Sequence, residues 1–143
     1  MSRTYLSVED CLIQRGRMKL LDAIVEADEQ RAVASSVPTE KWPLFYNGYI
    51  NPIVIVELVA QTSGIAIRCD EIKKSGGENQ EGGGLIVGIK EAFFFVSRIP
   101  VDAEIITCST KKYVHMEYAE YHGFSRSGEE KLGEATIQVL RTE

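Results

Sequence analysis

The apolar stretch that follows Asn51-Pro52 limits the possible folds of this 143-residue chain more than any other segment. Asparagine is a good N-cap and proline fits the first helical turn, so we expect one helix from Pro52 to about Lys73, roughly 33 Å long. Its first half is apolar on nearly every side, whereas its second half becomes polar from Arg68 onward. A helix that is apolar all round must be buried on every side, so the rest of the chain has to enclose it.

The segments on both sides of this helix have the composition and alternation of β-strands. The expected strands cover residues 18–27, 31–37, 85–95, 103–113, 114–124 and 132–140. Tight turns between neighbouring strands imply an antiparallel sheet. We therefore predict a single α+β domain over residues 1–143, with a curved antiparallel sheet of about six strands wrapped around the long central helix. The sheet of one chain cannot cover every side of that helix, so a homodimer or a higher homo-oligomer is expected.

Three other segments do not follow a strand pattern. Ser7 begins a predicted short helix that ends before Gly16, because serine can cap and the acidic residues after it suit the helix dipole. Residues 39–50 are rich in aromatic side chains without a clear period, which is typical of a loop packed over the core or a pocket. Residues 75–84 form a polar, glycine-rich link that lacks a phosphate-binding motif.

Charge and cysteine content exclude several classes of partner and site. A net charge of −5 gives no electrostatic attraction to nucleic acid or to an anionic membrane. Cys11, Cys69 and Cys108 are too widely spaced for a disulfide framework or a zinc site, so free thiols in a reducing cytoplasm are expected. The N-terminus lacks the apolar core of a signal peptide, and an acidic residue within 50–67 disfavours a membrane span. The sequence thus predicts a cytoplasmic protein that needs no metal and no cofactor.

Glu57 is the best catalytic candidate because it is the only ionisable residue in an otherwise apolar part of the helix. Apolar surroundings favour the protonated form of a carboxyl group, which suits a general acid. Gln61 lies one turn later on the same face and can hold Glu57 or anchor a neighbouring loop. The competing interpretation is that both side chains only anchor buried backbone.

A longer pattern surrounds these two residues. Residues 57–64 read Glu-Leu-Val-Ala-Gln-Thr-Ser-Gly, and weaker motifs occupy 14–22, 85–93 and 99–102. Together, over roughly residues 8 to 141, these segments resemble the FabZ-type 3-hydroxyacyl-[acyl carrier protein] dehydratases, whose central helix carries Glu-x-x-Ala-Gln-x-x-Gly. The resemblance implies a hot-dog fold and an acyl-thioester substrate carried on acyl carrier protein or coenzyme A, in fatty-acid or polyketide-type biosynthesis.

The chain departs from that family at the catalytic base. Family members carry Gly-His-Phe-Pro before the helix, and its histidine is the base. Here no histidine lies between Thr39 and Pro52, while His115 and His122 lie far downstream in one predicted strand. Pro52 also replaces the glycine whose N–H polarises the thioester carbonyl, because proline has no N–H. The amide of Ile53 is the candidate to replace it.

The resemblance and the aromatic loop together define the predicted substrate-binding residues: Gln61, Tyr46, Tyr49, Asn51, Ile53 and Gly64. Arg15 and Arg17 are either contacts for a phosphopantetheine arm or ordinary surface residues. Three functions stay open. The first is a dehydratase-like lyase with an altered acid/base set. The second is a thioesterase in which one carboxylate activates water, and the third is a non-catalytic acyl-thioester or acyl-carrier binding protein.

Overall fold

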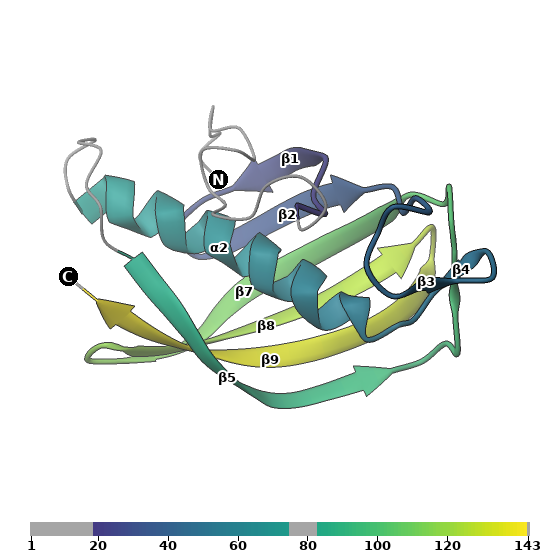
Figure 1. Ribbon diagram of the computed structural model, residues 1–143. Helices are drawn as coiled ribbons and strands as arrows, with labels where there is room; N and C mark the ends of the chain where they lie inside the picture. The colour runs from purple at the N-terminus through teal and green to yellow at the C-terminus, as the bar shows by residue number, and fades with distance from the viewer. Residues whose placement is uncertain (1–18, 75–82, 143) are drawn as a thin grey trace.

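A six-stranded antiparallel sheet curves around one long helix, as predicted (Figure 1). The computed structural model describes residues 19–74 and 83–142, so the helix expected to begin at Ser7 and the candidates Arg15 and Arg17 lie outside it. The sheet has the strand order β1-β2-β7-β8-β9-β5. Its strands are β1 (Ala23–Ala27), β2 (Arg31–Ser36), β5 (Gly83–Phe94), β7 (Ile105–His115), β8 (Tyr118–Ser127) and β9 (Glu130–Thr142).

The central helix α2 covers Val54–Lys74 and begins slightly later than the sequence predicts. Asn51 acts as the predicted cap, because its Oδ1 accepts a hydrogen bond from the Ile53 amide at 3.0 Å. The carbonyl of Asn51 also accepts the Val54 amide at 3.1 Å, so the chain makes one tight turn before the regular helix. Within the described part of the chain, no helix is long and apolar enough to cross a membrane.

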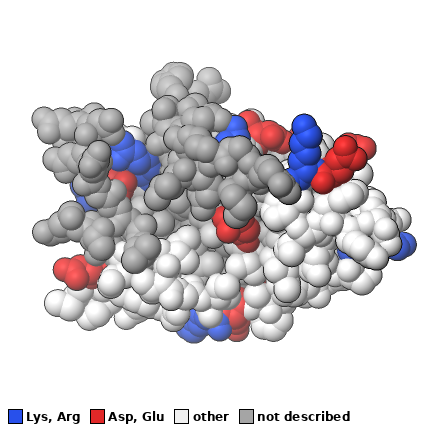
Figure 2. Space-filling view, viewed as in Figure 1, with Lys and Arg blue, Asp and Glu red and all other residues white. Residues whose placement is uncertain are grey.

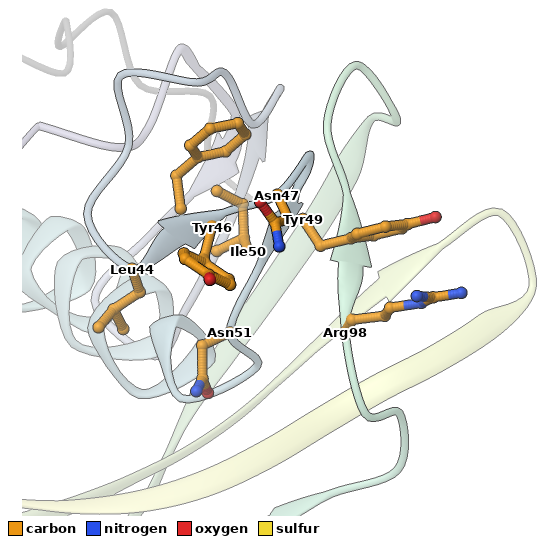
Figure 3. Close-up of a pocket in the computed structure, with 8 residues that line it drawn as sticks. Leu44, Tyr46, Asn47, Tyr49, Ile50, Asn51 and Arg98 are labelled. Atoms are coloured by element: carbon orange, nitrogen blue, oxygen red, sulfur yellow. The ribbon is translucent and has the colours of Figure 1, made fainter.

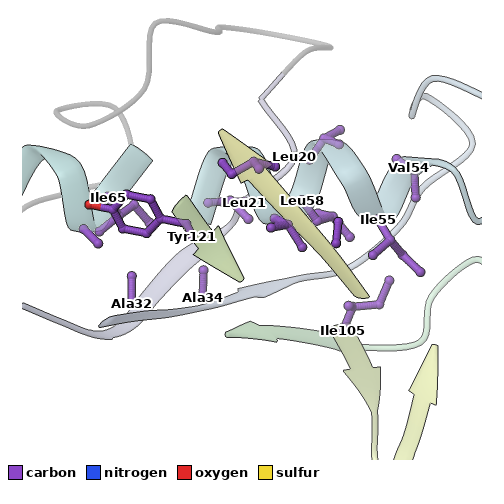
Figure 4. Packing of buried hydrophobic residues seen from close by; sticks show 14 of the residues in the cluster. Leu20, Leu21, Ala32, Ala34, Val54, Ile55, Leu58, Ile65, Ile105 and Tyr121 are labelled. Atoms are coloured by element: carbon purple, nitrogen blue, oxygen red, sulfur yellow. The ribbon is translucent and has the colours of Figure 1, made fainter. Parts of the chain in front are cut away.

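A glycine in β8 lets α2 pack closely against the sheet at one point. Along β8 every second residue is buried, and Gly123 lies directly beneath the helix. A Cβ atom at Gly123 would lie 2.7 Å from Cγ1 of Val59 and 2.9 Å from the carbonyl oxygen of Cys108. Figure 4 shows the helix side chains Ile55 and Leu58 in the core that this packing forms.

A second, three-stranded sheet lies beside the N-terminal end of α2 and was not predicted. It consists of β3 (Phe45–Tyr46), β4 (Tyr49–Ile50) and β6 (Ile99–Pro100). The predicted irregular loop 39–50 therefore contains a hairpin, whose turn residues Asn47 and Gly48 have φ angles of 50° and 85°. Asn-Gly is a strong signal for such a turn because both positions need positive φ. Pairing of β4 with β6 then brings the residues around 98–100 against this hairpin.

The predicted position of the two histidines in one strand is wrong. The chain turns at Met116, which has a φ of 56°, and not at the predicted boundary after Tyr113. His115 consequently ends β7, while His122 lies within β8. No glycine or proline marks the turn around Met116, so the predicted boundary after Tyr113 falls short of it.

The strand β5 forms one edge of the large sheet and is unusually apolar. Among the described residues it pairs with β9 only, so its other edge has no strand partner there. Large apolar side chains between 38% and 60% exposed occur along it and just beyond its end: Ile86, Val87, Ile89, Phe93, Phe94 and Phe95. A long, exposed, apolar edge strand is a ready template for pairing with another chain.

Candidate functional site

The first part of the candidate site is a short chain of hydrogen bonds on α2. Gln61 Nε2 donates to Glu57 Oε2 at 3.0 Å, and Gln61 Oε1 accepts the backbone amide of Leu20 at 3.0 Å. Gln61 is 2% exposed, whereas Glu57 is only half-buried. Gln61 thus combines both roles considered for it, because it holds the carboxyl group and fixes the backbone that precedes β1.

Replacing Gln61 with leucine should lower the free energy of unfolding by about 1–3 kcal/mol, because the buried Leu20 amide would lose its acceptor. Urea denaturation monitored by circular dichroism measures this. The matched control is Thr62→Val, which removes a buried hydroxyl that donates to the Leu58 carbonyl but leaves no amide unpaired. A smaller loss for Gln61→Leu than for Thr62→Val would show that the amide bond contributes little.

The second part of the site is a pocket of about 500 Å³ at the small sheet (Figure 3). Its lining comes from the β3–β4 hairpin, the residues beside it and one arginine: Leu44, Phe45, Tyr46, Asn47, Tyr49, Ile50, Asn51 and Arg98. Figure 2 shows that the surface over the N-terminal turns of α2 and this small sheet has few charged side chains. The volume of the pocket lies in the range of small-molecule sites, and the pocket walls combine aromatic rings with amide groups.

The structure places the predicted substrate-binding residues in two groups. Tyr46, Tyr49 and Asn51 line the pocket, and Tyr46 is 77% exposed. Gln61 and Gly64 lie on the helix face that carries Glu57, and neither they nor Glu57 line the pocket. Asn51 belongs to both regions, since it lines the pocket and caps the helix that holds Glu57.

The amide of Ile53, considered as a donor to the thioester carbonyl, is engaged within the protein. It donates to Asn51 Oδ1 at 3.0 Å, while the Ile53 side chain is 55% exposed. A substrate carbonyl would therefore have to displace the cap before it could use this amide.

Neither histidine of the chain faces the helix. His122 lies beside Gly123, whose inner side contacts Val59, so the alternation of the strand directs His122 to the outer face of the sheet. Its Nδ1 lies 2.9 Å from Thr136 Oγ1 and its Nε2 lies 3.2 Å from Glu134 Oε2. His115 is exposed at the end of β7. Within the residues that the structure describes, no group of three or more potential metal ligands occurs.

Arg98 is the lining residue that lies outside residues 44–51, and sequence reasoning missed it. It is distant from the hairpin in the chain and reaches the pocket only because β4 pairs with β6, where Tyr49 lies opposite Pro100. A two-residue strand pairing gives no periodic signal in the sequence. The Asn47-Gly48 pair is a turn signal in the sequence, but the pairing of β4 with β6 has no such signal.

Comparison with known proteins decides the family. The family model described as ApeP-like, ApeP dehydratase, matches residues 6–143. The chain belongs to the ApeP-like dehydratase family. The narrower FabZ-type assignment stays a prediction. Among curated proteins, none matches the chain significantly.

Solved structures show that this ApeP-like chain has the hot-dog fold. One chain of the dehydratase heterocomplex ApeI:P from Xenorhabdus doucetiae superposes with a TM-score of 0.81 and 13% identity, over 98% of this chain and 93% of that one. A hypothetical thioesterase with coenzyme A from Streptococcus pneumoniae gives 0.64 and 12%, over 83% and 84%. The virulence protein Cj0977 from Campylobacter jejuni gives 0.69 and 18%, over 93% and 84%.

Proposed function

We propose that this ApeP-like protein acts on 3-hydroxyacyl thioesters as a dehydratase, with Glu57 as the acid. The supporting observation is that Glu57 is half-buried, accepts a hydrogen bond from Gln61, and lies on the helix whose cap lines the pocket. A carboxyl group that a neighbouring side chain positions by a hydrogen bond can act as a general acid when it lies within reach of the departing group. Membership of a dehydratase family supports the reaction class.

The proposed reaction is β-elimination. A base removes the C2 proton, the electrons of that C–H bond form the C2–C3 double bond, and the C3–O bond breaks. Glu57 donates its proton to the departing hydroxyl group, which leaves as water. Neither histidine of the chain is placed to be this base, because His122 lies on the outer face of the sheet and His115 lies at the end of β7. A group on a second subunit meets this need.

A second candidate function is that of a non-catalytic subunit paired with a complete dehydratase site. The observation favouring it is again the position of the histidines, since His122 is engaged on both ring nitrogens at the outer face of the sheet. The similar chain from Xenorhabdus doucetiae belongs to a dehydratase heterocomplex, which supports this alternative. In that case Glu57 and Gln61 would have the structural role alone.

One incubation separates these functions from a thioesterase. The purified protein is mixed with an enoyl thioester and a 3-hydroxyacyl thioester, and both the conjugated double bond and free thiol are followed. Interconversion of the two thioesters supports the dehydratase, and thiol release supports a thioesterase. Binding without turnover supports the subunit role, and the absence of all three signals would contradict the proposed substrate class.

Subunits in the proposed assembly pair through β5. The unpaired edge, the exposed apolar side chains along it and the half-buried face of α2 support this choice. Extension of the sheet by a second copy would satisfy the free backbone groups of β5 and cover those side chains. It would also bring a second polypeptide toward the site, where a base is required.

Placing lysine at Ile89 should convert a dimer to monomers at micromolar concentration, because the charge would be buried at the paired edge. Sedimentation velocity measures the change. Val25→Lys is the matched control, since Val25 is 58% exposed on β1, the opposite edge of the same sheet. Dissociation by Val25→Lys but not by Ile89→Lys would place the interface at β1 and contradict pairing through β5. A wild-type monomer would contradict the assembly altogether.

A further inference from the structure

Arg98 and Tyr49 form a stacked pair at the pocket. The guanidinium carbon of Arg98 lies 4.1 Å from the centroid of the Tyr49 ring, within the range of a cation–π contact. Figure 3 shows the two side chains extending side by side in the same direction. Stacking on the ring restricts the guanidinium group. It uses none of the N–H donors in a conventional hydrogen bond, so these donors stay available for an anion.

The charge of Arg98 is not neutralised by a carboxylate in the part of the chain that the structure describes. Arg31 and Arg68 each form an ion pair with a glutamate, and Arg126 donates to a backbone carbonyl, but Arg98 has no such pair there. It is exposed on a protein of net charge −5. An unpaired cation that lines a pocket on an acidic protein is suited to bind an anionic part of a ligand.

The rest of the pocket restricts what that ligand can be. Leu44 and Tyr46 offer apolar and aromatic contacts, whereas Asn47 and Asn51 offer amide groups. A 4′-phosphopantetheine arm has matching parts: an apolar dimethyl segment, two amides and a phosphate at one end. A single exposed arginine also suits a phosphate, which guanidinium binds with two parallel hydrogen bonds.

We infer that Arg98, held by Tyr49, binds the phosphate of the 4′-phosphopantetheine arm that carries the acyl group. This inference rests on the proposed function, because it assumes an acyl-thioester ligand. The same phosphate is present on acyl carrier protein and on coenzyme A, so the shared arm is the ligand and the two sources are distinguished by experiment.

The test compares two ligands that differ only in the phosphate. Octanoyl amide analogues of 4′-phosphopantetheine and of pantetheine, which cannot be hydrolysed, are titrated into the full-length protein by calorimetry. The wild type should bind the phosphorylated ligand about ten-fold more tightly, as expected for one charge-assisted contact at an exposed site. Arg98→Gln should remove this difference and leave binding of the pantetheine ligand unchanged. Arg98→Lys should retain part of it, since lysine keeps the charge but not the fork.

Lys112→Gln is the matched control, because it removes the same charge from an exposed position on β7 and does not line the pocket. It should leave the difference between the two ligands intact. Octanoyl coenzyme A and an octanoyl carrier protein are then titrated with the same variants. The source whose affinity falls about ten-fold in Arg98→Gln is the one that delivers the phosphate to this pocket.

Two results would overturn the inference in different ways. If the wild type binds both analogues equally well, or if Arg98→Gln weakens both alike, the acyl-thioester function survives but Arg98 does not bind the phosphate. If neither analogue nor either carrier-bound ligand binds the wild type, the proposed function fails and the inference fails with it.

Discussion

Substituting glutamine for Glu57 should reduce turnover of a 3-hydroxyacyl thioester at least about 100-fold, because glutamine cannot donate the proton that the departing hydroxyl group needs. The protein should stay folded. The new amide is isosteric with the carboxyl group, and the contact with Gln61 can re-form through the amide oxygen. Initial rates of enoyl thioester formation and a thermal unfolding curve, measured on the same preparation, check both parts.

Glu71→Gln is the matched control for this prediction. Glu71 is also a half-buried glutamate on α2, but it lies near the C-terminal end, where Arg68 approaches it at 3.5 Å. Its substitution should leave turnover close to the wild-type rate. Equal rates for wild type and Glu57→Gln would remove Glu57 from the mechanism and leave it the structural role that the sequence also allowed.

The central helix shows what sequence reasoning can predict well. An Asn-Pro start, a long apolar run and a polar second half predict one buried helix, and α2 confirms it with Asn51 as the cap. These signals are local, so they do not depend on the rest of the fold. The apolar character of the first half also predicts enclosure, and the sheet supplies it on one side. The opposite face, with Glu57, is only half-buried within one chain.

The pocket shows what sequence reasoning cannot predict. Tyr46, Tyr49 and Asn51 were expected near the substrate because they precede the helix, and they do line one cavity. Arg98 reaches the same cavity through a single strand pairing between distant segments. Such a contact depends on how two sheets fit together, and no spacing or period in the sequence records it.

The catalytic base of the proposed elimination is not identified among the histidines of the chain. The sequence lacks a histidine before the helix, and the fold does not bring His115 or His122 to Glu57 from elsewhere. A local motif that is missing can be replaced by a distant residue only if the topology brings that residue to the same face. In this chain the topology directs His122 to the outer face and leaves His115 at the end of β7, so neither histidine supplies the base at Glu57.

The close approach of α2 to the sheet leads to the largest stability effect that we expect. A methyl group at Gly123 would lie 2.7 Å from Cγ1 of Val59 and 2.9 Å from the Cys108 carbonyl oxygen. A side chain can rotate away, but the carbonyl belongs to the neighbouring strand β7, where Cys108 pairs with Phe124. Gly123→Ala should therefore lower the free energy of unfolding by about 3 kcal/mol, toward the upper end for overpacking of a core. Urea denaturation measures it.

The matched control is the same substitution at Gly128, in the β8–β9 turn. A Cβ there would meet nothing within 4 Å, but its φ of 59° disfavours any L-residue. Gly128→Ala should lower the free energy of unfolding by about 1–2 kcal/mol, through backbone strain alone. The difference between the two losses in free energy of unfolding separates crowding beneath the helix from the loss of a glycine in general. If Gly123→Ala is no more destabilising than Gly128→Ala, the helix can move away from the sheet, and Glu57 is not held by this packing.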